Sequence, residues 1–167
     1  VLNTSDRFVC TPGGIATVDG KWLATSDTLL TDASGSSIEL GGTQVKVNGE
    51  AVPILYTSDR RVKFLCPDLA AATEITVSVG TTAGISNPVT GIVRPTMPLI
   101  LTLDDSDKDQ GVVSFPGTWA VAMERNHRVP ARPAQPGDEV AVWATGLGVT
   151  APPPSSLSVK LGGIYAQ

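Results

Sequence analysis

Apolar and polar residues alternate along much of the chain in the period of two that half-buried strands require. Ile75, Val77 and Val79 alternate with Thr76 and Ser78, and other runs repeat the pattern. Because successive side chains of a strand point to opposite faces, each run predicts one apolar face against a core and one face in water. The predicted strands of the first half are Ile15–Val18, Val45–Val47, Val52–Tyr56, Val62–Cys66, Ile75–Val79 and Val89–Val93.

Turn signals separate these runs at intervals of about ten residues, which is the spacing of strands in a β-sandwich. Asn48-Gly49 is the strongest short cue for a hairpin, and Pro67 stops the run that precedes it. The chain holds 17 glycines and 13 prolines and lacks Leu/Ala/Glu/Lys helical blocks. We therefore predict an all-β fold, with residues 1–11 as an extended lead-in and Ala24–Ser37 as a polar loop.

The second half of the chain starts at a proline-flanked junction, Arg94–Pro98, and continues in shorter apolar runs. These runs are Leu99–Leu103, Val112–Phe115 and Trp119–Met123. They fit either a hairpin that packs on the first sandwich or a bridge to a second one. Val129–Gln135 is predicted to be a stiff linker or edge segment, because each proline fixes its own φ and restrains the residue before it.

Two pairs of segments indicate an internal repeat. Pro136–Gly148 and Pro12–Leu23 both start a strand from a Pro-Gly turn, and Val45–Val52 aligns with Val159–Ala166. These matches predict a duplicated β unit whose second copy stops at Gln167, before its sandwich is complete. An incomplete sandwich leaves unpaired edges, so either the protein continues beyond this chain or another strand completes the unit.

The motifs around the first hairpin resemble a known class of module. Gly42–Ser58, followed by Val62–Pro67, is similar to the immunoglobulin-like IPT/TIG class. More closely, the order of motifs resembles a C-terminal domain of unknown function on large secreted acidobacterial proteins. The further matching pieces are Gly84–Val89, Pro130–Gly148 and Val159–Ala166.

The chain departs from this pattern at Arg60-Arg61 and Lys63, where uncharged residues are usual, and at Cys66, where Val is usual. The resemblance implies an immunoglobulin-like β-sandwich at residues 8–95, a connecting β segment at 96–129 and a partial second immunoglobulin-like unit at 130–167. It also implies an extracellular or cell-surface accessory module, with no catalytic residues to carry over.

Cys10 and Cys66 allow one pairing. They are either two reduced core thiols or a disulfide that ties the N-terminal segment to the strand ending at Cys66. We expect the disulfide, because the composition is typical of an extracellular protein. Closing a loop of this size contributes about 4 kcal/mol in the chain-entropy description.

Asp105, Asp107 and Asp109 alternate in a short acidic segment and form a candidate Ca²⁺ site, since a hard cation prefers several oxygen ligands. The segment is not an EF-hand loop, because Gln110 stands where a glycine would follow the third acid. The alternative is a solvated acidic turn.

Other candidate chemistry is sparse. His127 is the only histidine, and no nucleophile signature accompanies it, so we expect a surface histidine and no enzyme activity. Trp22, Trp119 and Trp143 would form a sugar-binding platform if they were clustered and exposed, and otherwise cover an interface. The net charge of −4 without a basic patch argues against nucleic acid, and no apolar run reaches the roughly 18 residues of a membrane span.

These observations predict a non-catalytic extracellular structural or adhesion module. Its expected partners are other copies of itself or adjoining domains of a larger protein, with assembly by strand complementation of the incomplete second unit. The alternative is an accessory domain that binds a glycan or Ca²⁺; no other cofactor is expected.

Overall fold

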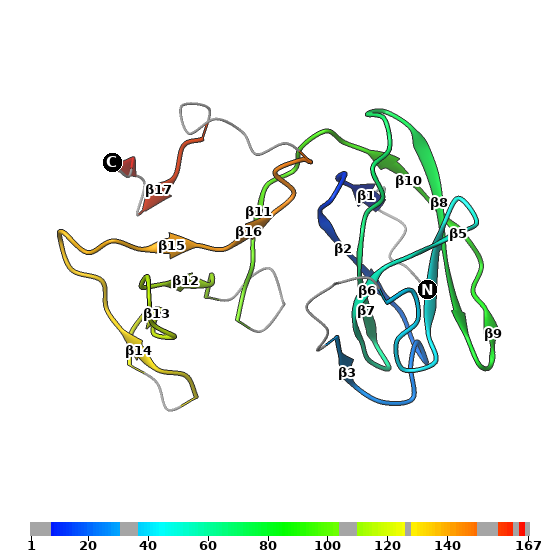
Figure 1. Ribbon diagram of the computed structural model, residues 1–167, viewed down its shortest axis with the longest axis horizontal. Coiled ribbons are helices and arrows are strands. Elements are labelled where there is room, and N and C mark those ends of the chain that lie inside the picture. The colour runs from blue at the N-terminus through cyan, green and yellow to red at the C-terminus, as the bar shows by residue number, and fades with distance from the viewer. Residues whose placement is uncertain are drawn as a thin grey trace. The chain divides into compact units, whose positions relative to one another are not determined.

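The structure, a computed structural model, describes residues 8–30, 37–103, 110–125, 128–149, 157–161 and 164–165 (Figure 1). Every regular element in these ranges is a β-strand, which confirms the predicted all-β class. No helix in this part of the chain is long and apolar enough to cross a membrane. The chain divides into two compact units, a first unit of Val1–Met97 with Gly146–Gln167 and a second unit of Pro98–Thr145.

One sheet of the first unit is built around its longest strand. Its order is β1 (Phe8–Cys10), β10 (Val89–Val93), β8 (Glu74–Thr81), β4 (Gln44–Val47) and β5 (Glu50–Val52), with β9 (Gly84–Ile85) paired to the end of β8. The pairing is antiparallel except for β1, which runs parallel to β10. The hairpin β4–β5 turns at Asn48-Gly49, where both residues have positive φ, as the sequence predicts.

The other sheet of the first unit is fully antiparallel. Its order is β2 (Ile15–Asp19), β7 (Arg61–Leu65), β6 (Ile54–Thr57) and β3 (Thr28–Leu29). The predicted strand Val52–Tyr56 is in fact split between the two sheets. Pro53 separates β5 from β6, because a proline has no N–H to donate to a ladder.

A single hydrophobic core lies between these sheets. The alternation in β8 buries Ile75, Val77 and Val79, and the alternation in β7 buries Val62 and Phe64. These residues belong to one cluster of buried side chains drawn from both sheets. The arrangement is therefore sandwich-like, and the period-two pattern predicts correctly which residues form its core.

Three strands of these two sheets, β1, β3 and β9, fall in segments for which the sequence predicts no strand. β1 lies in the expected lead-in, and it pairs with a strand about eighty residues away, so no hairpin cue marks it. β3 lies in the expected polar loop, and its two residues are too few to produce an alternating pattern.

The second unit consists of two-residue strands. β11 (Leu99–Ile100) pairs with β16 (Ala144–Thr145), and a second sheet has the order β14 (Ala131–Arg132), β13 (Val121–Ala122), β12 (Val113–Ser114) and β15 (Ala141–Val142). Among the residues described in this unit, only Phe115 and Val121 are buried apolar side chains. The large exposed ones are Leu99, Ile100, Leu103, Trp119 and Trp143.

The last described elements are β17 (Lys160–Leu161) and β18 (Ile164–Tyr165), which pair with each other. The compact units break after Met97 and after Thr145, so residues 130–145 lie with Pro98–Thr145. The duplication and the second sandwich at 130–167 stay predictions, because residues 150–156, 162–163 and 166–167 are outside the described part.

Candidate functional site

The two cysteines form a disulfide in the first unit. Cys10 ends β1 and Cys66 follows β7, with an S–S distance of 2.08 Å and a Cα–Cα distance of 5.7 Å. The backbone of Cys66 also pairs with the turn that follows β1: its N–H donates to the carbonyl of Gly14 (2.9 Å), and its carbonyl accepts from the N–H of Gly13 (3.1 Å). The disulfide therefore joins one sheet of the first unit to the end of a strand from the other.

The two Pro-Gly turns that the sequence pairs have the same local geometry. In the first, Gly14 donates its N–H to the carbonyl of Thr11 (2.8 Å), and in the second, Asp138 donates to Gln135 (3.0 Å). The glycine after the proline has a positive φ in both, 68° at Gly13 and 92° at Gly137. This is the type II turn, in which glycine is favoured at the third position, and each turn precedes a strand.

Trp22 lies in the turn after β2 and is 81% exposed. Its φ is 58°, in the left-handed region that bulky side chains rarely adopt. The left-handed conformation disfavours a residue with a Cβ by about 1–2 kcal/mol. Neither packing nor backbone preference explains a tryptophan at this position, and such strain is often found at functional sites.

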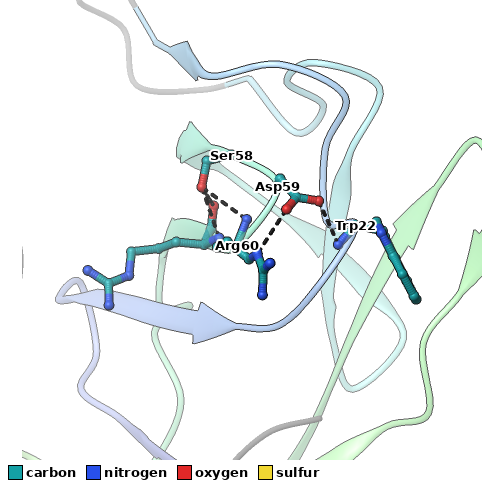
Figure 2. A network of polar contacts seen from close by, with 5 residues as sticks. Trp22, Ser58, Asp59 and Arg60 are labelled. Carbon is teal, nitrogen blue, oxygen red and sulfur yellow. Dashed lines mark hydrogen bonds and ion pairs between the residues drawn. The ribbon is translucent and has the colours of Figure 1, made fainter.

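The turn from β6 to β7 holds Trp22 in place (Figure 2). The Asp59 carboxylate accepts the N–H of Trp22 (2.9 Å) through Oδ1 and pairs with Arg60 Nε (2.9 Å) through Oδ2. The Asp59 carbonyl accepts the N–H of Leu23 (3.0 Å), and Leu23 is buried. Figure 2 shows the indole extended away from the carboxylate that anchors its backbone.

A buried serine stabilises the segment that presents Asp59. Ser58 Oγ accepts the N–H groups of Arg60 (3.3 Å) and Arg61 (2.9 Å). The Ser58 backbone N–H in turn donates to the carbonyl of Arg61 (2.8 Å). Asp59 is thus fixed by a closed turn at the start of β7, and Trp22 is fixed through Asp59.

Trp22 lines a surface pocket of about 400 Å³ in the first unit. The exposed lining of its wall is more apolar than polar, and its polar groups are the hydroxyls of Thr25, Thr81 and Thr82 and the Asp59 carboxylate. The lining residues are Trp22, Ala24, Thr25, Gly41, Gly42, Thr43, Asp59, Thr81, Thr82 and Ala83. A second pocket of about 310 Å³ shares Gly42, Thr81 and Thr82 with it, so the two are adjacent, and together they are called the groove below.

Packing behind the pocket makes this wall rigid. Thr43 is fully buried, and its hydroxyl donates to the carbonyl of Leu23 (2.6 Å), which links the floor to the Trp22 turn. Gly41 has a φ of 58°, and a Cβ there would lie 3.0 Å from Thr57 Oγ1, so a larger residue would disturb the floor. The pocket is therefore largely pre-formed, as small-molecule sites usually are.

The second unit has its own polar centre, around Arg132. The guanidinium carbon of Arg132 lies 3.5 Å from the centroid of the buried Phe115 ring. Its two terminal nitrogens, Nη1 and Nη2, donate to the Asp138 carboxylate (2.7 and 3.1 Å). The hydrogen bond from Arg132, followed by the one from the N–H of Gln135, holds the pKa of Asp138 below its ordinary value. The same side-chain bond raises the pKa of Arg132.

The segment Ala141–Thr145 forms an open edge of the second unit. β15 ends the order of its sheet, and β16 pairs only with β11. Trp143 donates its N–H to the carbonyl of Val112 (3.0 Å) and accepts from Leu101 (2.9 Å). Because backbone groups alternate along a strand, those of Val142 and Ala144 point to the other side, where no strand of the described chain lies.

The three tryptophans occupy different surroundings. Trp22 belongs to the first unit, whereas Trp119 (93% exposed) and Trp143 (55% exposed) belong to the second. The Trp143 indole N–H donates to Ser114 Oγ (3.0 Å) on β12. Of the three, only Trp22 lines one of the two pockets described above.

The predicted Ca²⁺ ligands Asp105, Asp107 and Asp109 lie outside the described residues, and so does His127. Among the described residues, no group of three His, Cys, Asp or Glu side chains is placed to hold a metal ion. The contribution of Asp59 and the threonines to a pocket was not predicted, because the positive φ of Trp22 and the pairing of distant turns have no short-range sequence signal.

A scan of protein-family models, a search of curated proteins and a search of solved structures each find no match to the chain.

Proposed function

We propose that the chain is a non-catalytic structural module of the immunoglobulin-like class, that it works outside the cytoplasm, and that it assembles through the open edge Ala141–Thr145. The observation that carries the assembly proposal is this edge, where the outward backbone groups of Val142 and Ala144 have no partner strand in the described chain. Its role is architectural, as a spacer or adhesion module of a larger secreted or surface protein.

The strand order of the first unit supports the immunoglobulin-like assignment. The order β2-β7-β6 corresponds to strands B, E and D of that fold, and β5-β4-β8-β10 corresponds to C′, C, F and G. β1 extends the second set beyond the last strand, and β3 extends the first set beyond D. The resemblance of the hairpin motifs to IPT/TIG modules points to the same class.

The disulfide supports a location outside the cytoplasm. Structural disulfides form and persist in oxidising compartments and are rare where thiols are kept reduced. Cys10 and Cys66 are 1% and 4% exposed, so this disulfide belongs to the core of the first unit rather than to a reactive surface.

The occupant of the open edge is a second copy of the chain. The segment A-V-W-A-T contains neither proline nor charge, two of the features that normally protect an edge. The opposite edge, β14, has both protections, since Pro130 and Pro133 flank it and Arg132 lies on it. Only one edge of this sheet is therefore free to pair.

A twofold axis at Trp143 makes the edge self-complementary. Val142 of one copy then lies opposite Ala144 of the other, and their outward N–H and C=O groups bond reciprocally. The half-exposed Trp143 side chains meet across the axis as a close aromatic pair, which stabilises antiparallel pairing.

Sedimentation velocity over a wide range of protein concentration tests the proposal. We expect the intact chain to dimerise and Ala144→Lys to be monomeric. Ala144 is exposed, and a charge added there opposes the pairing of a second strand with this edge. Ala134→Lys is the matched control, since it adds the same charge near the proline-flanked edge, and it should dimerise normally. A chain that is monomeric at every concentration, or an unaffected Ala144→Lys, contradicts assembly at this edge.

A further inference from the structure

We propose that the groove beside Trp22 is a carbohydrate-binding site for a short neutral oligosaccharide, with one sugar ring stacked on the Trp22 indole. The site lies entirely in the first unit and is independent of assembly at the open edge. The argument rests on the placement of Trp22, on the chemistry of the wall and on the second pocket of the groove.

Trp22 is placed for contact with a ligand and not for packing. The indole is 81% exposed, and the backbone has a φ of 58°, which a glycine or asparagine would adopt more readily. Asp59 nevertheless fixes this conformation through the Trp22 N–H (2.9 Å). A large aromatic face that is left uncovered on an anchored backbone provides a stacking surface for a ligand ring.

The chemistry of the groove fits a sugar. The C–H groups on one face of a pyranose ring carry partial positive charge, and they complement the electron-rich face of an indole. Sugar hydroxyls need nearby donors and acceptors, which the hydroxyls of Thr25, Thr81 and Thr82 and the Asp59 carboxylate provide. The threonine wall is uncharged, and Asp59 is already paired with Arg60, so the wall favours a neutral ligand.

The second pocket of the groove offers a place for another sugar unit. The pocket of about 310 Å³ adjoins the Trp22 pocket, and the two share Gly42, Thr81 and Thr82. Glu39, Gln44 and Lys46 line this second pocket, and the Gln44 amide donates to the Glu39 carboxylate (3.3 Å). Polar side chains of this pocket can bind the hydroxyls of a second ring, whereas the indole binds the first.

Affinity electrophoresis and calorimetry of the intact chain with cellohexaose, laminarin, mannan and xylan test the site. We expect at least one of these neutral glycans to bind, and Trp22→Asn to weaken that binding by at least about tenfold. Trp22→Phe should be intermediate, because it retains a smaller ring. Trp119→Asn is the matched control, since it removes another highly exposed indole from the other unit, and it should bind normally.

Thermal unfolding of the same variants separates a ligand site from a structural role. Because asparagine tolerates positive φ and keeps the backbone N–H that Asp59 accepts, Trp22→Asn should have an unchanged or higher Tm. Absence of binding to all four glycans, unchanged glycan affinity in Trp22→Asn, or a clear fall in its Tm overturns the proposal. A monomeric chain that still binds a glycan refutes only the assembly proposal.

Discussion

The two units of the chain use similar turns and similar residue types but reach very different degrees of packing. The first unit buries a continuous core between two sheets and closes it with a disulfide, whereas the second buries Phe115 and Val121 among its described residues. The second unit relies on an arginine that covers Phe115 and binds Asp138. The difference indicates that strand length, more than turn chemistry, decides how much apolar surface a β unit can bury.

Strand length has this effect because an alternating strand contributes one buried residue for every two of its length. β8 has eight residues and buries Ile75, Val77 and Val79, whereas each strand of the second unit has two residues. The second unit is consequently the part for which we propose a partner, and the first unit is the part that presents a pocket. Four experiments test this comparison.

The largest expected effect is the loss of a core aromatic ring. Phe64→Ala removes a fully buried side chain of the first unit and should reduce its free energy of unfolding by about 3–5 kcal/mol. Phe115→Ala is the matched change in the second unit and should disorder that unit alone. Amide NMR spectra of both variants check this; loss of first-unit signals in Phe115→Ala would contradict the independence of the units.

Reduction of the disulfide should have the next largest effect. The two cysteines are 56 residues apart in sequence, so opening the link should destabilise the first unit by about 2–4 kcal/mol. Denaturant unfolding of the Cys10→Ser/Cys66→Ser double variant measures the loss. Chemical shifts of Pro98–Thr145 should not change, and a change there would mean that the second unit depends on the crosslink.

The paired Pro-Gly turns allow a smaller, symmetrical test. Gly13→Ala and Gly137→Ala both place a Cβ on a residue with positive φ, and each should destabilise its own unit by about 1–2 kcal/mol. No backbone clash distinguishes the two, because the added Cβ would meet only Val149 Cγ1 at 3.6 Å in the first turn and nothing within 4 Å in the second. Unit-resolved hydrogen exchange measures both; a neutral result at either position refutes the type II geometry there.

The smallest expected effect is a dependence of the second unit on pH. The folded pKa of Asp138 is lowered, so its contribution to stability is present above the unfolded value of about 3.9 and is lost as the pH falls through the folded pKa. An NMR titration below about pH 4 should weaken signals of the second unit. Asp138→Asn should remove that dependence, and an unchanged acid profile in this variant would contradict the role of the pair.

Much of the first unit could be predicted from sequence, because its strands are long enough to alternate and its hairpin has a local cue. Ile75–Val79 and Asn48-Gly49 show this. β1 and β3 have no such local signal, because their pairing depends on distant residues. The candidate site can be predicted from the sequence only in part. Trp22 is one of three tryptophans, and no local sequence signal distinguishes it, because its positive φ and its hydrogen bond to Asp59 arise from tertiary structure.

The parallel pairing of β1 with β10 has a consequence under mechanical load. Tension applied between Phe8 and Val93 pulls the two strands lengthwise in opposite directions, so their hydrogen bonds are loaded together in shear. If β1 detaches from β10, the Cys10–Cys66 disulfide carries the force to Cys66 and so to the chain that leads into β8. The 56-position span that the disulfide closes then stays out of the extension, which shortens the extension by about 190 Å. The disulfide therefore limits how much the end-to-end length of the first unit increases when the unit unfolds under force.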